Sequence, residues 1–238
     1  MSRYIYFILL LLTGVLILNI SCEDERMDVN EMEVLWDTTR YDFNTGGLFG
    51  SRLPEDNLLT VQGVELGRML FYEKKLSGDN TQACAGCHHQ EFAFTDTSRF
   101  SIGIEGLKGK RQAMSVFNMA WNRNAFFWDG RAHLLRDQSL MPIEDPLEMN
   151  ASIDEVIVKL SDSDIYRDQF KRTFGDEIIT SEKMALALEQ FMLSIVSYDS
   201  KYDRWKAGME TLTPSEERGR LLFNTEFNPF FPENSGAD

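Results

Sequence analysis

The chain starts with a predominantly apolar segment and continues with amphipathic segments of helical period. The apolar segment runs from Tyr4 to Leu18. Further along, Ser152–Leu160 and Ser181–Tyr198 repeat apolar residues every three or four positions, as one face of a helix does. Ser152 and Glu155 have the spacing of a helix cap. The second segment carries one apolar stripe of Leu188, Phe191, Met192 and Ile195.

Alternating strand patterns are weak throughout, so the sequence predicts a mainly α fold. Two stretches, Arg99–Lys110 and Pro142–Asn150, read as long ordered loops, which in a helical protein often surround a bound group. Residues 23–57 are polar and irregular, with Gly46-Gly47 and Pro54, and predict a tether ahead of the folded body.

A short motif occurs twice and indicates two similar domains. Glu65-Leu66-Gly67-Arg68-Met69-Leu70-Phe71 returns as Glu217-Arg218-Gly219-Arg220-Leu221-Leu222-Phe223. Thr213, Pro214 and Glu216 predict a capped helix start before the second copy. A chance match is the alternative for so short a motif. We predict a first domain over 58–205 and, over 206–238, the truncated start of a second similar domain.

The N-terminus predicts export. Arg3 precedes the apolar run, and a small residue and Cys22 follow it, which resembles a bacterial lipobox although Asn19 stands where leucine is usual. A membrane-spanning helix is the alternative, but the apolar run falls short of the roughly 20 residues that such a helix needs. We expect residues 1–22 to be a lipoprotein-type signal peptide, Cys22 to carry a lipid anchor, and the protein to lie in the cell envelope facing the periplasm.

The charge balance narrows the class of partner. The formal net charge is -14. Such an acidic chain is unsuited to the phosphate backbone, so no nucleic acid partner is expected.

Cys84-Ala85-Gly86-Cys87-His88 is the strongest chemical motif in the sequence. Two thiols at this spacing, followed by a histidine, are typical of covalent haem c attachment, with His88 as iron ligand. A disulfide, a thioredoxin-like site and a structural zinc site are alternatives. The first two leave His88 unexplained, and zinc lacks a second pair of ligands because only His89 and His133 remain.

The sixth position of the iron decides between catalysis and electron transfer, because a catalytic haem keeps it open. Candidate internal ligands follow the motif: His133, Met114, Met119, Met141 and Met149. If one of them binds the iron, the protein is a mono-haem electron-transfer cytochrome instead of an enzyme.

A family resemblance extends over about residues 58–238. The order of motifs resembles bacterial di-haem cytochrome c peroxidases and their MauG relatives: Leu66-Gly67-Arg68, Cys84 to His88, Phe127-Trp128-Asp129-Gly130-Arg131, Gln138, Pro142-Ile143 and Glu148-Met149. The resemblance implies two cytochrome-c-like helical domains, a peroxidatic haem in the first and a high-potential haem in the second. One covalent haem is expected in this chain and a second in a full-length parent.

The resemblance also implies roles for individual residues. Trp128 would lie on the electron path between the haems, and Gln138 and Glu148 would line the distal pocket. A carboxylate in a partly apolar pocket, such as Glu148, can take a proton from peroxide and return it. Arg131 is expected to pair with a haem propionate.

The predicted reaction is the reduction of hydrogen peroxide to water with electrons from a small protein such as a cytochrome c. A MauG-like haem oxidase that acts on an organic or protein substrate is the alternative enzyme. A homodimer is compatible with either reading.

The chain departs from the family pattern at two places. Ser101-Ile102-Gly103-Ile104-Glu105 holds no histidine where the family often has a distal one, which predicts an open sixth position at rest. Gln112 follows Arg111 where an asparagine associated with interdomain calcium is usual, so calcium is left unsupported.

Overall fold

The computed structural model describes residues 34–226 and residue 230. The predicted signal peptide and Cys22 therefore lie outside the described residues. The helices are α2 (Val61–Phe71), α3 (Leu135–Glu144), α4 (Ile153–Ser161), α5 (Asp164–Phe174), α6 (Ser181–Ser194), α7 (Lys201–Lys206) and α8 (Pro214–Asn224). Short 3₁₀ turns are η1 (Lys74–Leu76), η2 (Cys84–Gly86), η3 (Gln90–Phe92) and η4 (Met119–Trp121).

The described residues form no β-strand and contain only isolated bridges, such as Ile102↔Lys108 and Phe126↔Ala132. The mainly α fold is thus confirmed, and Arg99–Lys110 is an irregular loop as expected. No helix of the described part combines the length and the apolar character that crossing a bilayer would require.

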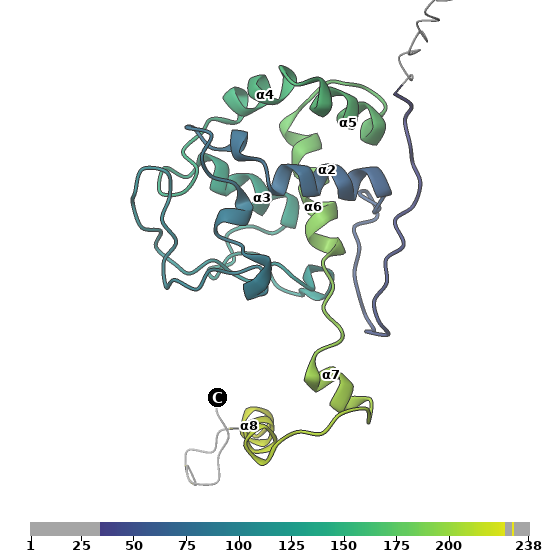
Figure 1. Ribbon diagram of the computed structural model, residues 1–238, viewed down its shortest axis with the longest axis vertical. Coiled ribbons are helices and arrows are strands. Elements are labelled where there is room, and N and C mark those ends of the chain that lie inside the picture. Colours follow the sequence, from purple (N-terminus) through teal and green to yellow (C-terminus); the bar gives the residue numbers. More distant parts are fainter. Residues whose placement is uncertain (1–33, 227–229, 231–238) are drawn as a thin grey trace, which may run out of the picture. The chain divides into compact units, whose positions relative to one another are not determined.

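Helices α2 and α6 make the most extensive helix contact, and they cross each other closely (Figure 1). Gly67 makes this approach possible, because a Cβ built there would lie 1.9 Å from the carbonyl oxygen of Ala187. Leu66, Leu70 and Leu188 are almost fully buried around the crossing. Burying side chains of this size stabilises the fold by about 1.5–3 kcal/mol each. The Leu66-Gly67-Arg68 motif is therefore the centre of the helix crossing.

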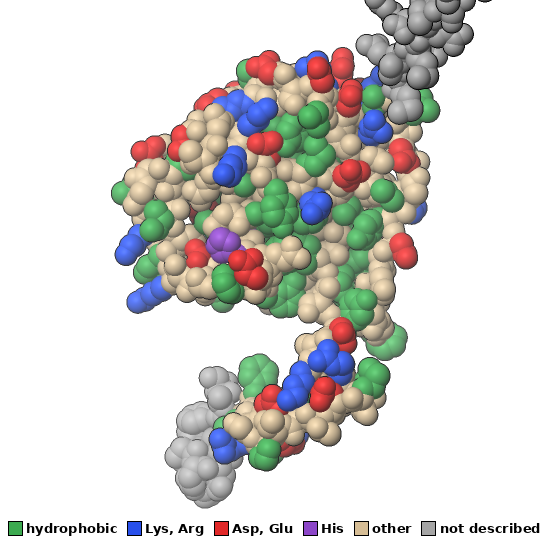
Figure 2. All heavy atoms as spheres, viewed as in Figure 1, with side chains coloured by type: hydrophobic (Ala, Val, Ile, Leu, Met, Phe, Trp, Pro, Cys, Tyr) green, Lys and Arg blue, Asp and Glu red, His purple; other side chains and the backbone are tan. Residues whose placement is uncertain are grey.

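Helices α3, α4 and α5 complete one core around this pair. α3 also packs on α6, and α5 packs on α2 and α4. Ile143 of α3, Leu160 of α4 and Phe170 of α5 have no exposed surface. Figure 2 shows acidic and basic side chains interspersed on the face drawn, with apolar side chains between them.

Two of the predicted helix segments begin at the caps that the sequence indicates. The Ser152 hydroxyl accepts a hydrogen bond from the Glu155 amide at 3.2 Å. At α8, Thr213 and Glu216 form a reciprocal capping box, with Pro214 at the first turn. The first copy of the repeated motif lies in α2, capped by Thr60. Both copies are therefore helical, although α8 buries none of its residues.

Two predicted boundaries were wrong. The helix expected over Ser181–Tyr198 ends at Ser194, because the chain turns away to bond Asn118, whose amide nitrogen donates to the Ile195 carbonyl at 2.8 Å. The loop expected from Pro142 starts only at Asp145, since Pro142 lies inside α3. After α3 the chain folds back, and backbone amides of the following loop donate to the last carbonyls of the helix. The Ala151 amide, for example, donates to the Ile143 carbonyl at 2.9 Å.

The later part of the segment predicted as a tether is hydrogen-bonded along the helical body. The Asp37 amide donates to the Arg172 carbonyl at 2.9 Å, and the Arg52 amide donates to the Ala120 carbonyl at 2.7 Å. Asn57, at the end of the segment, is 5% exposed. Residues 36–57 are thus packed against the fold.

Candidate functional site

One tight turn gathers the three residues of the attachment motif. The amides of Cys87 and His88 both donate to the Cys84 carbonyl, at 3.1 and 3.0 Å. Cys84 and Cys87 are free thiols, which leaves the disulfide alternative without support. Burial raises the pKa of Cys84 to about 12 and also raises that of Cys87, so both are neutral thiols. The turn thus places both thiols and the imidazole on one short stretch of backbone, as covalent haem attachment requires.

The His88 ring is oriented by a backbone carbonyl. Its Nδ1 lies 2.8 Å from the Phe94 oxygen. Because a carbonyl only accepts, Nδ1 carries the proton and Nε2 keeps its lone pair for a metal. Burial lowers the pKa of His88, which favours this neutral form. Ala93 and Phe94, both with positive φ of 59° and 56°, turn the carbonyl toward the ring.

A cavity of about 840 Å³ opens beside His88. This volume lies within the roughly 300–1,000 Å³ of ligand and cofactor pockets. Most of the predicted site residues line the cavity together: Cys87, His88, Trp128, Arg131, Gln138 and Glu148. Cys84 lines a small adjoining pocket with Cys87 and His88. Residues that are far apart in the sequence are thus brought to one place.

These residues fit a covalently attached haem. Two thiols and a metal-competent imidazole stand at the edge of a large, partly apolar cavity, and basic side chains, Lys110, Arg111 and Arg131, also line it and suit carboxylate groups of a cofactor. In the described part of the chain no group of three or more His, Cys, Asp or Glu side chains is placed to hold a metal ion, so the zinc alternative has no support.

Glu148 is the carboxyl group of the cavity with the most unusual acidity. Burial, and next the charge of Asp145, raise its pKa to about 7, against a weaker lowering by Arg131. At neutral pH both protonation states are populated. A group of this kind can accept and return a proton in one reaction cycle.

Gln138 and Trp128 lie on different parts of the cavity wall. Gln138 belongs to α3 and faces both the main cavity and the small pocket. Trp128 is 63% exposed, and its indole nitrogen donates to the Gln112 carbonyl at 3.0 Å. The Trp128 ring therefore lies at the rim of the cavity and is not packed in the core.

Arg131 is held at the rim by neighbouring side chains. It forms an ion pair with Asp129 at 2.9 Å, and its guanidinium lies 3.5 Å from the centre of the Phe127 ring. Asp129 also pairs with Arg111 at 3.0 Å. The same carboxylate thus fixes two basic side chains beside the cavity.

The structure separates the candidate sixth ligands. His133 and Met141 are exposed and do not line the cavity. Met114 and Met119 are in its wall, and Met149 lines the small pocket. Met114, Met119 and Met149 therefore remain candidates, because the small pocket also includes His88.

The loop without the expected histidine contacts the Glu148 backbone directly. Ser101, Ile102 and Gly103 line the cavity, and the Ile104 amide donates to the Glu148 carbonyl at 2.9 Å. A Cβ at Gly103 would lie 2.2 Å from the Leu147 oxygen. The loop therefore supports the segment that carries Glu148.

Sequence reasoning missed several residues of the site. Lys110, Asn122 and Asn124 line the cavity from loops, where no periodicity marks a buried face. Met192 was predicted only as part of an apolar helical stripe, yet it also lines the cavity. A helical stripe shows which face is buried but does not show what lies against it.

The sequence matches known proteins over most of the described part. Residues 61–211 match the family model described as di-haem cytochrome c peroxidase. The methylamine utilization protein MauG of Methylophilus methylotrophus is 34% identical over 172 residues, which are 72% of this chain and 51% of that protein. Cytochrome c551 peroxidase of Nitrosomonas europaea is 38% identical over 162 residues, which are 67% of this chain and 48% of that protein.

Solved structures show the same likeness. A MauG-like protein associated with microbial copper homeostasis superposes with a TM-score of 0.69 at 33% identity, over 81% of this chain and 56% of that chain. The diheme peroxidase BthA of Burkholderia thailandensis gives 0.63 at 25% identity, over 73% of this chain and 49% of that chain. The chain spans about half the length of the curated relatives it matches.

Proposed function

Because this chain belongs to the di-haem cytochrome c peroxidase family, we propose that it binds haem c through Cys84 and Cys87 and reduces hydrogen peroxide to water. Electrons come from a small redox protein such as a cytochrome c. One observation carries the proposal: His88, with Nε2 left for a metal, and Glu148, with a pKa of about 7, line one cavity.

The haem, when bound, supplies the iron that exchanges electrons with peroxide. The overall reaction takes one peroxide, two electrons and two protons to two water molecules. Glu148 as carboxylate accepts the proton of one peroxide oxygen and, as acid, returns it to the other oxygen as the O–O bond breaks. Gln138 donates and accepts hydrogen bonds that hold the peroxide. Burial favours the neutral form of His88, and the Phe94 carbonyl holds its ring with the proton on Nδ1.

The first test uses the haem-loaded ferric protein. A high-spin visible spectrum that shifts on addition of cyanide supports an open sixth position and a catalytic site. With a reduced cytochrome c as donor, peroxide should then be consumed with two donor molecules oxidised for each peroxide. A low-spin spectrum that cyanide leaves unchanged would mean that Met114, Met119 or Met149 occupies the position, and the electron-carrier function would replace the peroxidase.

The exposed Trp128 favours a second candidate, a MauG-like oxidase. An aromatic ring that is 63% exposed at the cavity rim can pass an electron or a hole to a macromolecular partner as well as to a second haem. Oxidation of an added protein substrate by hydrogen peroxide, with little turnover of reduced cytochrome c, would select this candidate over the peroxidase. Replacing Trp128 by phenylalanine should slow either reaction.

We further propose that residues 206–238 open a second domain of the same kind, which carries the second haem. The repeat of the α2 motif in α8 supports this, as do the exposed apolar side chains of α8, Leu221, Leu222 and Phe223. Haem counting on a longer parent chain tests it. The homodimer stays a prediction, which light scattering on the purified protein checks.

The location is also a proposal. The apolar run followed by Cys22 supports export to the periplasm and a lipid anchor on that cysteine. Replacement of Cys22 by alanine should release the protein from the membrane fraction. A protein that stays membrane-bound after this change would contradict the anchor.

A further inference from the structure

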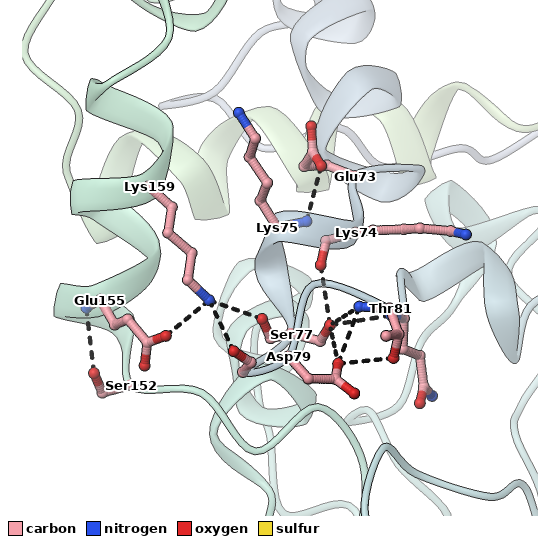
Figure 3. Close-up of polar contacts among 11 residues, drawn as sticks. Glu73, Lys74, Lys75, Ser77, Asp79, Thr81, Ser152, Glu155 and Lys159 are labelled. Atoms are coloured by element: carbon pink, nitrogen blue, oxygen red, sulfur yellow. Dashed lines mark hydrogen bonds and ion pairs between the residues drawn. The ribbon is translucent and has the colours of Figure 1, made fainter.

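The turn before the attachment motif is organised around a buried serine. Ser77 has no exposed surface, and its hydroxyl lies 3.0 Å from the Lys74 carbonyl. The same hydroxyl oxygen accepts hydrogen bonds from the amides of Thr81 and Gln82, at 3.1 and 3.0 Å (Figure 3). Asp79 closes the turn with a second bond to the Thr81 amide at 3.0 Å. One hydroxyl thus fixes a whole turn.

On one side this turn leads into the haem-attachment segment. The side-chain amide of Gln82 donates to the Cys87 sulfur at 3.3 Å. Ala83, which follows, is buried and precedes Cys84. The position of the first attachment cysteine therefore depends on how the Ser77 turn holds Gln82.

On its other side the turn holds the backbone next to Glu148. The Gly78 amide donates to the Met149 carbonyl at 2.8 Å. A Cβ at Gly78 would lie 2.5 Å from the Asn150 oxygen, so only glycine allows this approach. The turn therefore touches both the attachment segment and the segment that carries Glu148.

A single lysine of α4 fastens the turn to the body. The Lys159 ammonium donates to the carbonyls of Ser77 and Gly78, at 2.9 and 3.2 Å, and pairs with Glu155 at 2.8 Å. Figure 3 shows the side chain reaching from α4 to the two carbonyls. All three N–H groups of the ammonium are used, and Lys159 itself is not part of the cavity wall.

We propose that the Ser77 turn, fastened by Lys159, is a positioning unit that holds the haem-attachment segment and the Glu148 segment at a fixed separation. This inference rests on the proposed function, since it concerns the same cavity. The rate of a catalysed reaction falls when a catalytic group is displaced by as little as about 1 Å. Lys159 is therefore a positioning residue. It acts through the backbone of the Ser77 turn, which contacts both the attachment segment and the Glu148 segment.

The test compares Lys159→Met with Lys183→Met in the haem-loaded protein. Lys183 is a matched control, because both side chains are 19% exposed and each binds one carboxylate. Lys183 donates to one backbone carbonyl, that of Ile178, where Lys159 donates to two. Both variants should lose similar stability in urea unfolding. Only Lys159→Met should change the ferric spectrum and alter the Kd for cyanide by at least about threefold. It should also lower kcat for peroxide about tenfold. Lys159→Arg should stay near the parent values.

Equal cyanide affinities and equal kcat values in the two methionine variants would overturn the proposal, because Lys159 would then serve stability alone. If Lys159→Met does not fold, Ser77→Ala against Thr173→Val makes the same comparison, since Thr173 also buries a hydroxyl bonded to backbone. The cyanide measurement does not require peroxidase activity. Unchanged peroxide turnover in Glu148→Gln would contradict the proposed function. That outcome is therefore distinguishable from a failure of the positioning unit, which the cyanide affinities report.

Discussion

Glu148 connects burial to chemistry at the scale of one residue. Its carboxyl lies in the cavity wall, and the pKa of about 7 follows first from desolvation and then from the charge of Asp145. The proton acceptor is the ionised form. We therefore expect kcat/KM for peroxide to rise with pH through about 7 and to level off above it. A pH profile of peroxide turnover measures this, and a flat profile between pH 5 and 8 would contradict it.

Glu148→Gln should lower kcat/KM for peroxide by about 10²-fold or more, because an amide cannot accept and return the proton. The matched control is Glu144→Gln, which changes an exposed glutamate at the end of α3. It should leave the rate unchanged. Steady-state kinetics with reduced cytochrome c decides, and similar rates for the two variants would remove Glu148 from the mechanism.

The same carboxyl should make stability depend on pH. The pKa of Glu148 is raised from 4.5 to about 7 on folding, so the folded chain binds the proton more tightly than the unfolded chain. The extra stability is fully present below pH 4.5 and is lost as the pH rises to about 7, by roughly 3 kcal/mol. Urea unfolding between pH 4.5 and 8 should show this slope in the parent protein and lack it in Glu148→Gln.

At the scale of elements, the repeated motif places two glycines in different surroundings. A Cβ at Gly67 would meet the Ala187 carbonyl at 1.9 Å, whereas a Cβ at Gly219 would meet nothing within 4 Å. Gly67→Ala should therefore destabilise the chain by about 1–3 kcal/mol through the forced separation of α2 and α6. Gly219→Ala should stabilise α8 by up to about 1 kcal/mol. Thermal unfolding of both variants checks the contrast.

The second domain proposed for residues 206–238 extends this prediction. If α8 crosses a helix of that domain as α2 crosses α6, Gly219→Ala in a longer parent chain should be as damaging as Gly67→Ala. Equal tolerance of Gly219→Ala in the short and long chains would count against a second domain built on this helix.

At the scale of the whole molecule, one buried polar network joins distant parts of the chain. Arg136 of α3 pairs with Glu189 of α6 at 2.9 Å and with Asp56 at 2.8 Å. Asn57 donates to Glu189 at 2.7 Å and accepts from Gln190 at 2.8 Å. Because Glu189 is only 2% exposed, these hydrogen bonds and the ion pair compensate for the removal of its carboxylate from water. The network ties residues 36–57 to the helices of the cavity wall.

Arg136→Met should therefore cost about 3 kcal/mol of stability, since it leaves a buried carboxylate without its cation. The double variant Arg136→Met/Glu189→Met should lose less than Arg136→Met alone. Arg204→Met, which removes an exposed ion pair with Asp199, should cost less than about 1 kcal/mol. Chemical unfolding of the set tests this, and additive losses in the double variant would show that the two groups are not coupled.

The sequence by itself determined the local features of this protein. The attachment motif needs only one turn of chain, the caps at Ser152 and Thr213 need only four residues, and the stripe of α6 follows from helical period. Each of these features depends on residues that are close in sequence, so each could be predicted from the sequence. The mainly α class followed from the same periodicity.

Tertiary structure alone decided where these elements stop and what the site groups do. α6 ends at Ser194 because Asn118, far away in sequence, takes over its backbone bonds. Glu148 has a pKa near 7 because the fold removes water from it, which no residue pattern records. Lys159 and Ser77 meet only because α4 packs on η1. Such effects arise from contacts between segments remote in sequence, so only the folded chain defines them.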